Sequence, residues 1–236
     1  MRTMIAAAGG AWLMLLGVVV PAGAAGPQAT YPPPTSFEPF RMASPAEEIA
    51  LARSAAPASI ANDAEILTLG SHDYQTTVKG KNGFTCLVQR SWVNTFDNAE
   101  FWNPKIRVAI CLNPPAVRSV LPAYLETTRW VLAGVSKDEM AARTRAALAA
   151  HRVADPEPGA MSYMMSKQGY ITDNGGHWYS HVMFFMPHTD GALWGANSTA
   201  APVFSQDVGP MTYFFVLVPK WSDGTAVFPG TETHTH

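Results

Sequence analysis

The chain lacks the short signatures of several common enzyme classes. It contains no G-x-G-x-x-G, no G-x-x-x-x-G-K-[ST], no H-E-x-x-H, no C-x-x-C, no G-x-S-x-G and no S-x-x-K. These patterns supply phosphate cradles, metal ligands, redox pairs or activated nucleophiles. Their absence disfavours nucleotide cofactors, zincin chemistry, thioredoxin chemistry and the common serine-hydrolase elbow. We find no internal repeat.

Charge is also scarce. Asp, Glu, Lys and Arg make up 14% of the 236 residues, and the formal net charge is −2 with no concentrated basic cluster. Binding to nucleic acid or to an anionic membrane relies on concentrated positive charge. We therefore expect no nucleic-acid partner. Aromatic residues reach 11%, which indicates a well-filled core or aromatic side chains available for binding.

The first 24 residues have the pattern of a secretory signal peptide. A basic residue, Arg2, precedes the apolar run Ala11–Val20 and a small-residue site at Ala22-Gly23-Ala24. The apolar run is too short to span a membrane comfortably as a mature helix. We expect cleavage after Ala24, or after Ala25. The product would be an exported protein, periplasmic or secreted, with no stable membrane insertion.

Cysteine is limited to Cys86 and Cys111. An even number of cysteines in an exported chain predicts a disulfide bond. A bridge between them would close a loop of moderate length and stabilise the fold by about 3 kcal/mol. The alternative is that one of the two sulfurs is a nucleophile.

Proline and capping patterns divide the chain. Residues 25–43 are rich in proline and predict an extended, disordered arm, although Tyr31, Phe37 and Phe40 could let it lie across the domain. Residues 44–228 predict a single domain, and 229–236 a frayed tail. Two capping boxes, Ser44 with Glu47 and Ser136 with Glu139, mark helix starts. Another helix should begin at Asn113 and be kinked or split at Pro122.

Alternating or apolar runs predict strands at 64–69, 74–78, 84–92, 106–112 and 211–219. Asn82-Gly83 predicts a hairpin turn between the second and third of these strands. The composition of 199–209 predicts a loop. The fold class is α+β. We expect a mainly antiparallel sheet of about five to seven strands, with two or three helices from Asn113–His151 packed on one face, and one disulfide.

The stretch from Gly159 to Pro187 carries most of the polar chemistry. Two short apolar runs flank Asp173-Asn174-Gly175-Gly176, which predicts a hairpin with a four-residue loop. This register pairs Tyr170 with Tyr179 and Gln168 with His181. Alternating residues would then share one face, which gives our candidate ligand-binding site: Ser166, Gln168, Tyr170, His177, Tyr179 and His181. Trp102 or Trp178 could contribute. The alternative is an ordinary half-exposed hairpin, and a bulge at Gly169 would break the pattern.

Three catalytic or metal-binding alternatives use the same residues. His177 and His181 lie four apart and precede His188 and Asp190, but on a strand they would be about 13 Å apart, too far to share an ion. We expect no metal and no cofactor. Lys167 could activate Ser166 only across a turn or bulge. Cys86 with the later His181 resembles the cell-wall cysteine peptidases of the NlpC kind. It departs from them because Cys86 lies in a predicted strand and Cys111 is available as a disulfide partner.

From Glu47 to about Gly224 the chain resembles a group of exported bacterial proteins with no assigned activity. The residues that carry the likeness are Ala52-Arg53-Ser54-Ala55-Ala56-Pro57, Asn82-Gly83-Phe84-Thr85-Cys86, Phe101-Trp102-Asn103-Pro104, Met164-Met165-Ser166-Lys167-Gln168-Gly169-Tyr170 and Gly176-His177-Trp178. The resemblance implies export and no mechanism. We expect a non-catalytic domain that binds a small ligand or a cell-envelope component. The alternative is a hydrolase using His181 with Cys86 or with a bound metal ion. The oligomeric state stays open.

Overall fold

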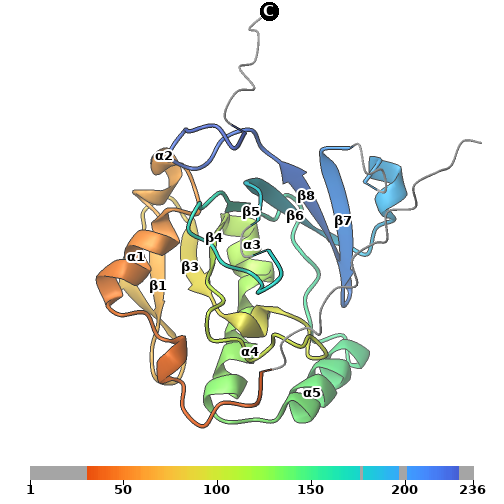
Figure 1. Cartoon of the computed structure of the whole chain (residues 1–236). Helices are drawn as coiled ribbons and strands as arrows, with labels where there is room; N and C mark the ends of the chain where they lie inside the picture. Colours follow the sequence, from red (N-terminus) through yellow and green to blue (C-terminus); the bar gives the residue numbers. More distant parts are fainter. Residues whose placement is uncertain (1–30, 176–177, 197–200, 229–236) are drawn as a thin grey trace, which may run out of the picture.

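The computed structural model describes residues 31–175, 178–196 and 201–228 (Figure 1). These residues form an eight-stranded sheet in the order β2-β1-β3-β4-β5-β6-β8-β7. Every neighbouring pair is antiparallel except β1 and β3. The strands are β1 (Glu65–Leu69), β2 (Tyr74–Val78), β3 (Thr85–Gln89), β4 (Val108–Leu112), β5 (Met161–Met164), β6 (His181–Pro187), β7 (Val203–Val208) and β8 (Met211–Leu217).

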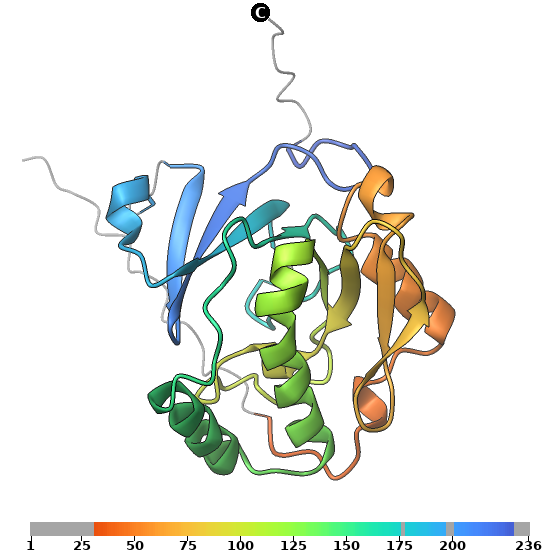
Figure 2. The ribbon, with the colours of Figure 1, turned by 180° about the vertical axis from the view of Figure 1, so that it is seen from behind.

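Helices lie on both faces of this sheet. They are α1 (Pro45–Arg53), α2 (Ala58–Ala61), α3 (Pro114–Ser119), α4 (Leu121–Leu132) and α5 (Lys137–Ala149), with 3-10 turns η1 (Glu38–Phe40), η2 (Ser91–Val93) and η3 (Gly191–Trp194). Viewed from behind, α3 and α4 cross the sheet and α5 lies at its lower end (Figure 2). The α+β class and the mainly antiparallel sheet are confirmed, with α1 as an additional helix on the opposite face.

Local capping signals fix where the helices begin. The Ser44 hydroxyl accepts a hydrogen bond from the Glu47 N–H at 3.2 Å, and the Ser136 hydroxyl accepts one from the Glu139 N–H at 3.3 Å. Both interactions satisfy donors that a helix leaves unpaired at its N-terminus. The predicted split is found at Val120, between α3 and α4, and Pro122 is the second residue of α4. Its missing N–H cannot continue the hydrogen bonding of α3.

The first three strands depart from the predicted hairpins. β1 and β2 form one, but β3 pairs with β1 in parallel and not with β2. The chain must therefore cross the end of β1 before β3 begins. Gly80 permits this, because a Cβ there would come within 2.3 Å of the Glu65 backbone nitrogen. The predicted Asn82-Gly83 hairpin between β2 and β3 is thus wrong, since a close backbone crossing takes its place.

The predicted disulfide is confirmed. Cys86 and Cys111 are bonded and stand opposite one another on β3 and β4, and both are fully buried. They belong to a core cluster beneath α1, with Leu51, Ile66 and Val88 among its members. A larger core on the other face includes Leu87, Ile110 and Val131.

Residues 31–43 of the proline-rich arm pack on the domain, which corrects the expectation of disorder for this part of the arm. Phe40 is only 1% exposed. Its ring packs against Trp92 with centroids 5.4 Å apart, and Phe37 packs against Trp92 edge-on at 6.4 Å. The aromatic residues thus bury enough surface to hold a segment that its proline content alone would leave extended. The predicted signal peptide and tail fall outside the described residues.

The hairpin of 159–187 is formed with a different register. β5 and β6 pair as expected, but Ser162 faces Met183 and Met164 faces His181. Relative to the prediction, the register is shifted by four residues, and a long connection, 165–180, replaces the four-residue loop. The Trp178 ring lies against Gly169, where a Cβ would approach it to 2.5 Å. The contact between Trp178 and Gly169 within this connection therefore takes the place of the strand pairing that was predicted beyond Met164.

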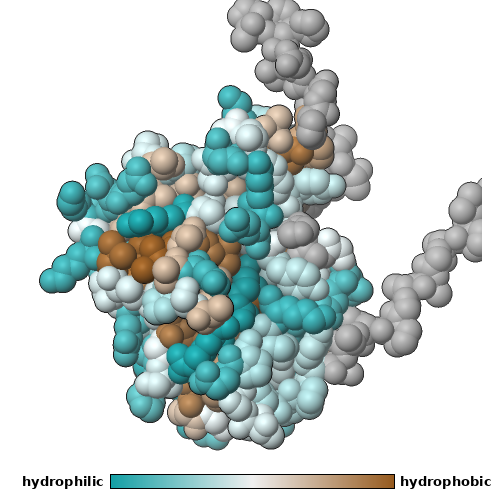
Figure 3. Space-filling view, turned by 60° about the vertical axis from the view of Figure 1, so that its left-hand side comes forward, coloured by the Kyte–Doolittle hydropathy of each residue, from teal (hydrophilic) through white to brown (hydrophobic). Residues whose placement is uncertain are grey.

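The C-terminal strands also differ in part from expectation. β7 (Val203–Val208) forms where a loop was predicted, so β8 is the second strand from the edge. Phe204 of β7 stacks on Phe215 of β8 with centroids 4.7 Å apart. On the face shown in Figure 3, hydrophobic residues appear as patches separated by hydrophilic ones. No helix within the described ranges is long and apolar enough to cross a membrane.

Candidate functional site

The five predicted ligand-binding residues that the structure describes do not share a face. Ser166, Gln168 and Tyr170 lie in the connection after β5, not on a strand. Ser166 is buried, and its hydroxyl lies 2.7 Å from the hydroxyl of Ser54. Gln168 is exposed, and the Tyr170 hydroxyl donates to Asp173 at 2.5 Å. The alternation used in the prediction required a strand through all three, and the strand ends at Met164.

The remaining predicted residues also separate. His177 lies outside the described residues. Tyr179 is 59% exposed and packs against Phe228 with ring centroids 5.4 Å apart. His181, the first residue of β6, is 5% exposed and lies against the rings of Trp178 and Phe215. Its Nδ1 is 2.8 Å from the Tyr179 carbonyl oxygen, and its buried Nε2 has no partner among the described residues.

His181 predicts an acid-sensitive component of stability. Burial lowers its pKa below the ordinary value of 6.5, so below about pH 6.5 the unfolded chain takes up a proton that the folded protein resists. The contribution of the neutral His181 side chain to the free energy of unfolding is fully present above that pH and is lost as the pH falls. We expect the free energy of unfolding to drop between pH 7 and 5, by at most about 1.4 kcal/mol per pH unit. Urea titrations of the wild type and His181→Gln over that range check this, and an equal drop in both proteins would contradict it.

A small aromatic pocket lies beside the predicted residues. We call it the tryptophan pocket; its volume is about 390 Å³, and its lining is Lys167, Gly175, Trp178, Tyr179, Trp221 and Val227. Lys167 forms an ion pair with Asp223 at 2.7 Å, and this hydrogen bond lowers the pKa of the Asp223 carboxyl. Of the five predicted residues within the described ranges, Tyr179 alone is in this lining.

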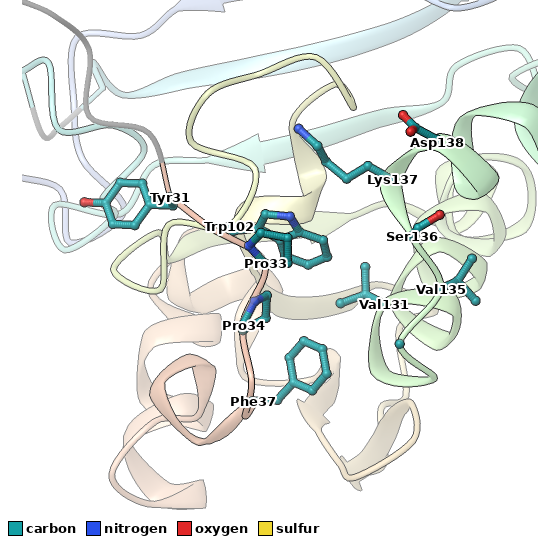
Figure 4. Close-up of a pocket in the computed structure, with 11 residues that line it drawn as sticks. Tyr31, Pro33, Pro34, Phe37, Trp102, Val131, Val135, Ser136, Lys137 and Asp138 are labelled. Atoms are coloured by element: carbon teal, nitrogen blue, oxygen red, sulfur yellow. The ribbon is translucent and has the colours of Figure 1, made fainter.

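A larger pocket lies between the proline-rich arm and the corner that joins α4 to α5. We call it the arm pocket; its volume is about 530 Å³. Figure 4 shows arm residues on one side, Val131 and Val135 on the other, and Trp102 between them. Its lining is Tyr31, Pro33, Pro34, Phe37, Trp102, Val131, Gly134, Val135, Ser136, Lys137 and Asp138. The walls are mainly apolar, and the charged side chains come from the start of α5.

The side of the arm pocket that the proline-rich arm forms is held in place at both ends. At one end, Phe37 and Phe40 pack on Trp92. At the other, the Tyr31 hydroxyl donates to Asp173 at 2.5 Å, and the Lys105 ammonium donates to the same carboxylate at 3.0 Å. The stretch between them is therefore held over the pocket.

Asp173 joins this wall to the connection before β6. Hydrogen bonds from Tyr170, Tyr31 and Lys105 lower the pKa of its carboxyl well below the ordinary range. The carboxylate therefore stays ionised at physiological pH, so that its contacts with the arm persist. Asp173 is consequently a structural anchor of the arm pocket.

Trp102 contributes an unused hydrogen-bond donor. The residue is 6% exposed, and its buried indole Nε1 has no partner in the described part of the chain. Its ring packs edge-on against Phe101 at 4.7 Å. A buried N–H without an acceptor is costly and uncommon. It is a group that a ligand acceptor atom would satisfy.

The structure disfavours the two nucleophile alternatives. Cys86 is bonded to Cys111 and so offers no thiol. The Lys167 ammonium pairs with Asp223, while the Ser166 hydroxyl lies beside Ser54. Within the described ranges, no group of three or more His, Cys, Asp and Glu side chains comes together to hold a metal ion.

The arm pocket could not be predicted from the sequence. Its walls come from 31–37, Trp102 and 131–138, which are brought together by tertiary packing. Three signals were present: the aromatic residues within the proline-rich arm, the aromatic loop around Trp102, and the Gly134 helix end followed by the Ser136 cap.

Comparisons with protein-family models, with curated proteins and with solved structures give no match.

Proposed function

We propose that this protein is an exported, non-catalytic domain that binds a small ligand or a small part of a cell-envelope component in the arm pocket. The observation that carries this proposal is a pocket of about 530 Å³ with apolar walls and a buried, unpartnered Trp102 N–H. Ligand sites in proteins are commonly pockets of about 300–1,000 Å³ lined by apolar groups with a few polar ones.

Export is supported by two features. The N-terminal segment has the composition of a signal peptide, and a buried disulfide is consistent with folding in an oxidising compartment. The intact mass of the protein recovered from outside the cytoplasm should correspond to a chain that starts after Ala24 or Ala25.

A neutral apolar dye tests the site. We expect N-phenyl-1-naphthylamine to bind the wild type with a rise in fluorescence, because its phenyl and naphthyl groups fit an apolar pocket of this size. Replacing Val135, which lines the arm pocket, by Trp should fill the cavity and weaken binding by about tenfold or more, since the lost contact area is comparable to one side chain. Fluorescence titration of both proteins measures the change.

The matched control is the same substitution in the other pocket. Val227 lines the tryptophan pocket, so Val227→Trp should leave dye binding unchanged. Loss of binding in Val227→Trp, with full binding in Val135→Trp, would move the site to the tryptophan pocket. Failure of the wild type to bind would contradict the proposal altogether.

A further inference from the structure

The polar end of the arm pocket has the character of an anion site, an inference that rests on the proposed function. Ser136, Lys137 and Asp138 line this end, and they are the cap and first two residues of α5, a helix of 13 residues. The first N–H groups of a helix have no partner within it, and the helix dipole places partial positive charge there. Among the described residues, the Ser136 hydroxyl accepts a hydrogen bond only from the Glu139 N–H.

Lys137 adds a full positive charge to this end. Its ammonium lies 5.5 Å from the centre of the Phe101 ring, and no carboxylate of the described residues comes within ion-pair distance of it. A cation beside an aromatic face and an apolar wall is partly desolvated, which strengthens its attraction to an anion.

Trp102 provides a second, independent indication. Its indole nitrogen can only donate a hydrogen bond, and it is buried without an acceptor. In Figure 4 this nitrogen lies on the edge of the ring nearer Lys137. The unused donor and the unpaired cation therefore belong to the same part of the pocket.

Two acidic side chains lie near this end. Asp138 is in the lining, and in Figure 4 its carboxylate extends from α5 toward the side of the view where Lys137 lies. Asp97 is close enough for Lys137 to influence it, but its pKa is lowered mainly by the Thr95 side chain. Neither forms an ion pair with Lys137, so the positive end is not neutralised by direct contact.

We propose that the ligand of the arm pocket is a small amphipathic anion, with a compact apolar or aromatic body and one anionic group. The body packs against Pro33, Phe37 and Val135. The anionic oxygens accept hydrogen bonds from Trp102 Nε1, from the Lys137 ammonium and from the N-terminal N–H groups of α5. Charged acceptors form the stronger hydrogen bonds with such donors.

A pair of dyes that differ in charge tests this inference. 1-Anilinonaphthalene-8-sulfonate has the same aromatic body as N-phenyl-1-naphthylamine and carries one sulfonate. We expect the sulfonate dye to bind about tenfold more tightly, because its hydrogen bonds are charge-assisted. Lys137→Gln should remove this preference by weakening the sulfonate dye about tenfold and leaving the neutral dye unchanged. Lys81→Gln, at an ammonium with 83% side-chain exposure, should change neither.

The outcomes separate the two proposals. If both dyes bind equally and Val135→Trp abolishes both, the anion inference is overturned and the binding function stands. If neither dye binds the wild type, the proposed function falls and the inference falls with it. If Lys81→Gln weakens the sulfonate dye as much as Lys137→Gln does, the preference reflects overall charge, and the anion site is overturned.

Discussion

Replacing Glu48 by alanine is expected to lower the free energy of unfolding by about 3–5 kcal/mol, because the change leaves a buried arginine without its counter-ion. The Arg90 side chain is fully buried, and its Nη2 donates to Glu48 Oε1 at 2.8 Å. The same oxygen accepts a hydrogen bond from the Leu69 N–H at 3.2 Å. Glu48 itself is 4% exposed, so water cannot easily replace it.

The effect should be large because this ion pair joins three parts of the fold. Arg90 Nε donates to the Phe40 carbonyl oxygen at 2.6 Å, and its Nη1 donates to the Val88 carbonyl oxygen. The arm, α1 and β3 therefore meet at one guanidinium. Loss of Glu48 would weaken the attachment of the arm as well as that of α1.

Urea unfolding followed by fluorescence measures this prediction, with Glu47→Ala as the matched control. Glu47 precedes Glu48 on α1, is exposed, and forms no ion pair with another described residue. Its replacement should change stability by less than about 0.5 kcal/mol. Equal losses in the two variants would show that the loss of a negative charge from the first turn of α1, and not the buried pair, carries the effect.

Removing the disulfide should have the second-largest effect. The double replacement of Cys86 and Cys111 by alanine frees a loop with a sequence separation of 25 residues, which in the chain-entropy model costs about 3 kcal/mol. Both sulfurs are fully buried in the core beneath α1, so lost packing would add to this cost.

Comparison of the urea midpoints of the oxidised wild type and the double variant measures the cost. Alkylation of the unfolded protein without reductant checks the bond itself by intact mass. We expect no alkyl group to be added. Addition of two groups would contradict the disulfide and would restore Cys86 as a candidate nucleophile.

The parts of the fold that depend on neighbouring residues could be predicted from the sequence. Ser44 and Ser136 cap their helices through hydrogen bonds only three residues away, and Pro122 divides α3 from α4 for a covalent reason. The disulfide followed from an even number of cysteines in a chain expected to be exported. None of these signals requires knowledge of the tertiary packing.

The errors arise where distant segments meet. Asn82-Gly83 is a good hairpin turn locally, but β1 occupies the position next to β3. The connection 165–180 could have continued the hairpin, but Trp178 packs on Gly169 and Asp173 binds Tyr31 and Lys105. The predicted six-residue face depended on that continuation. The arm pocket depends on the same long-range contacts, and pattern analysis therefore could not locate it.

The most direct test of the arm pocket as a ligand site is the NMR signal of the Trp102 indole N–H. Its resonance can be assigned by its loss in Trp102→Phe. If the pocket binds the sulfonate dye, titration should shift this resonance and leave those of Trp178 and Trp221, which line the tryptophan pocket, in place. Shifts of Trp178 and Trp221 with an unmoved Trp102 resonance would contradict the account and place the ligand beside Tyr179.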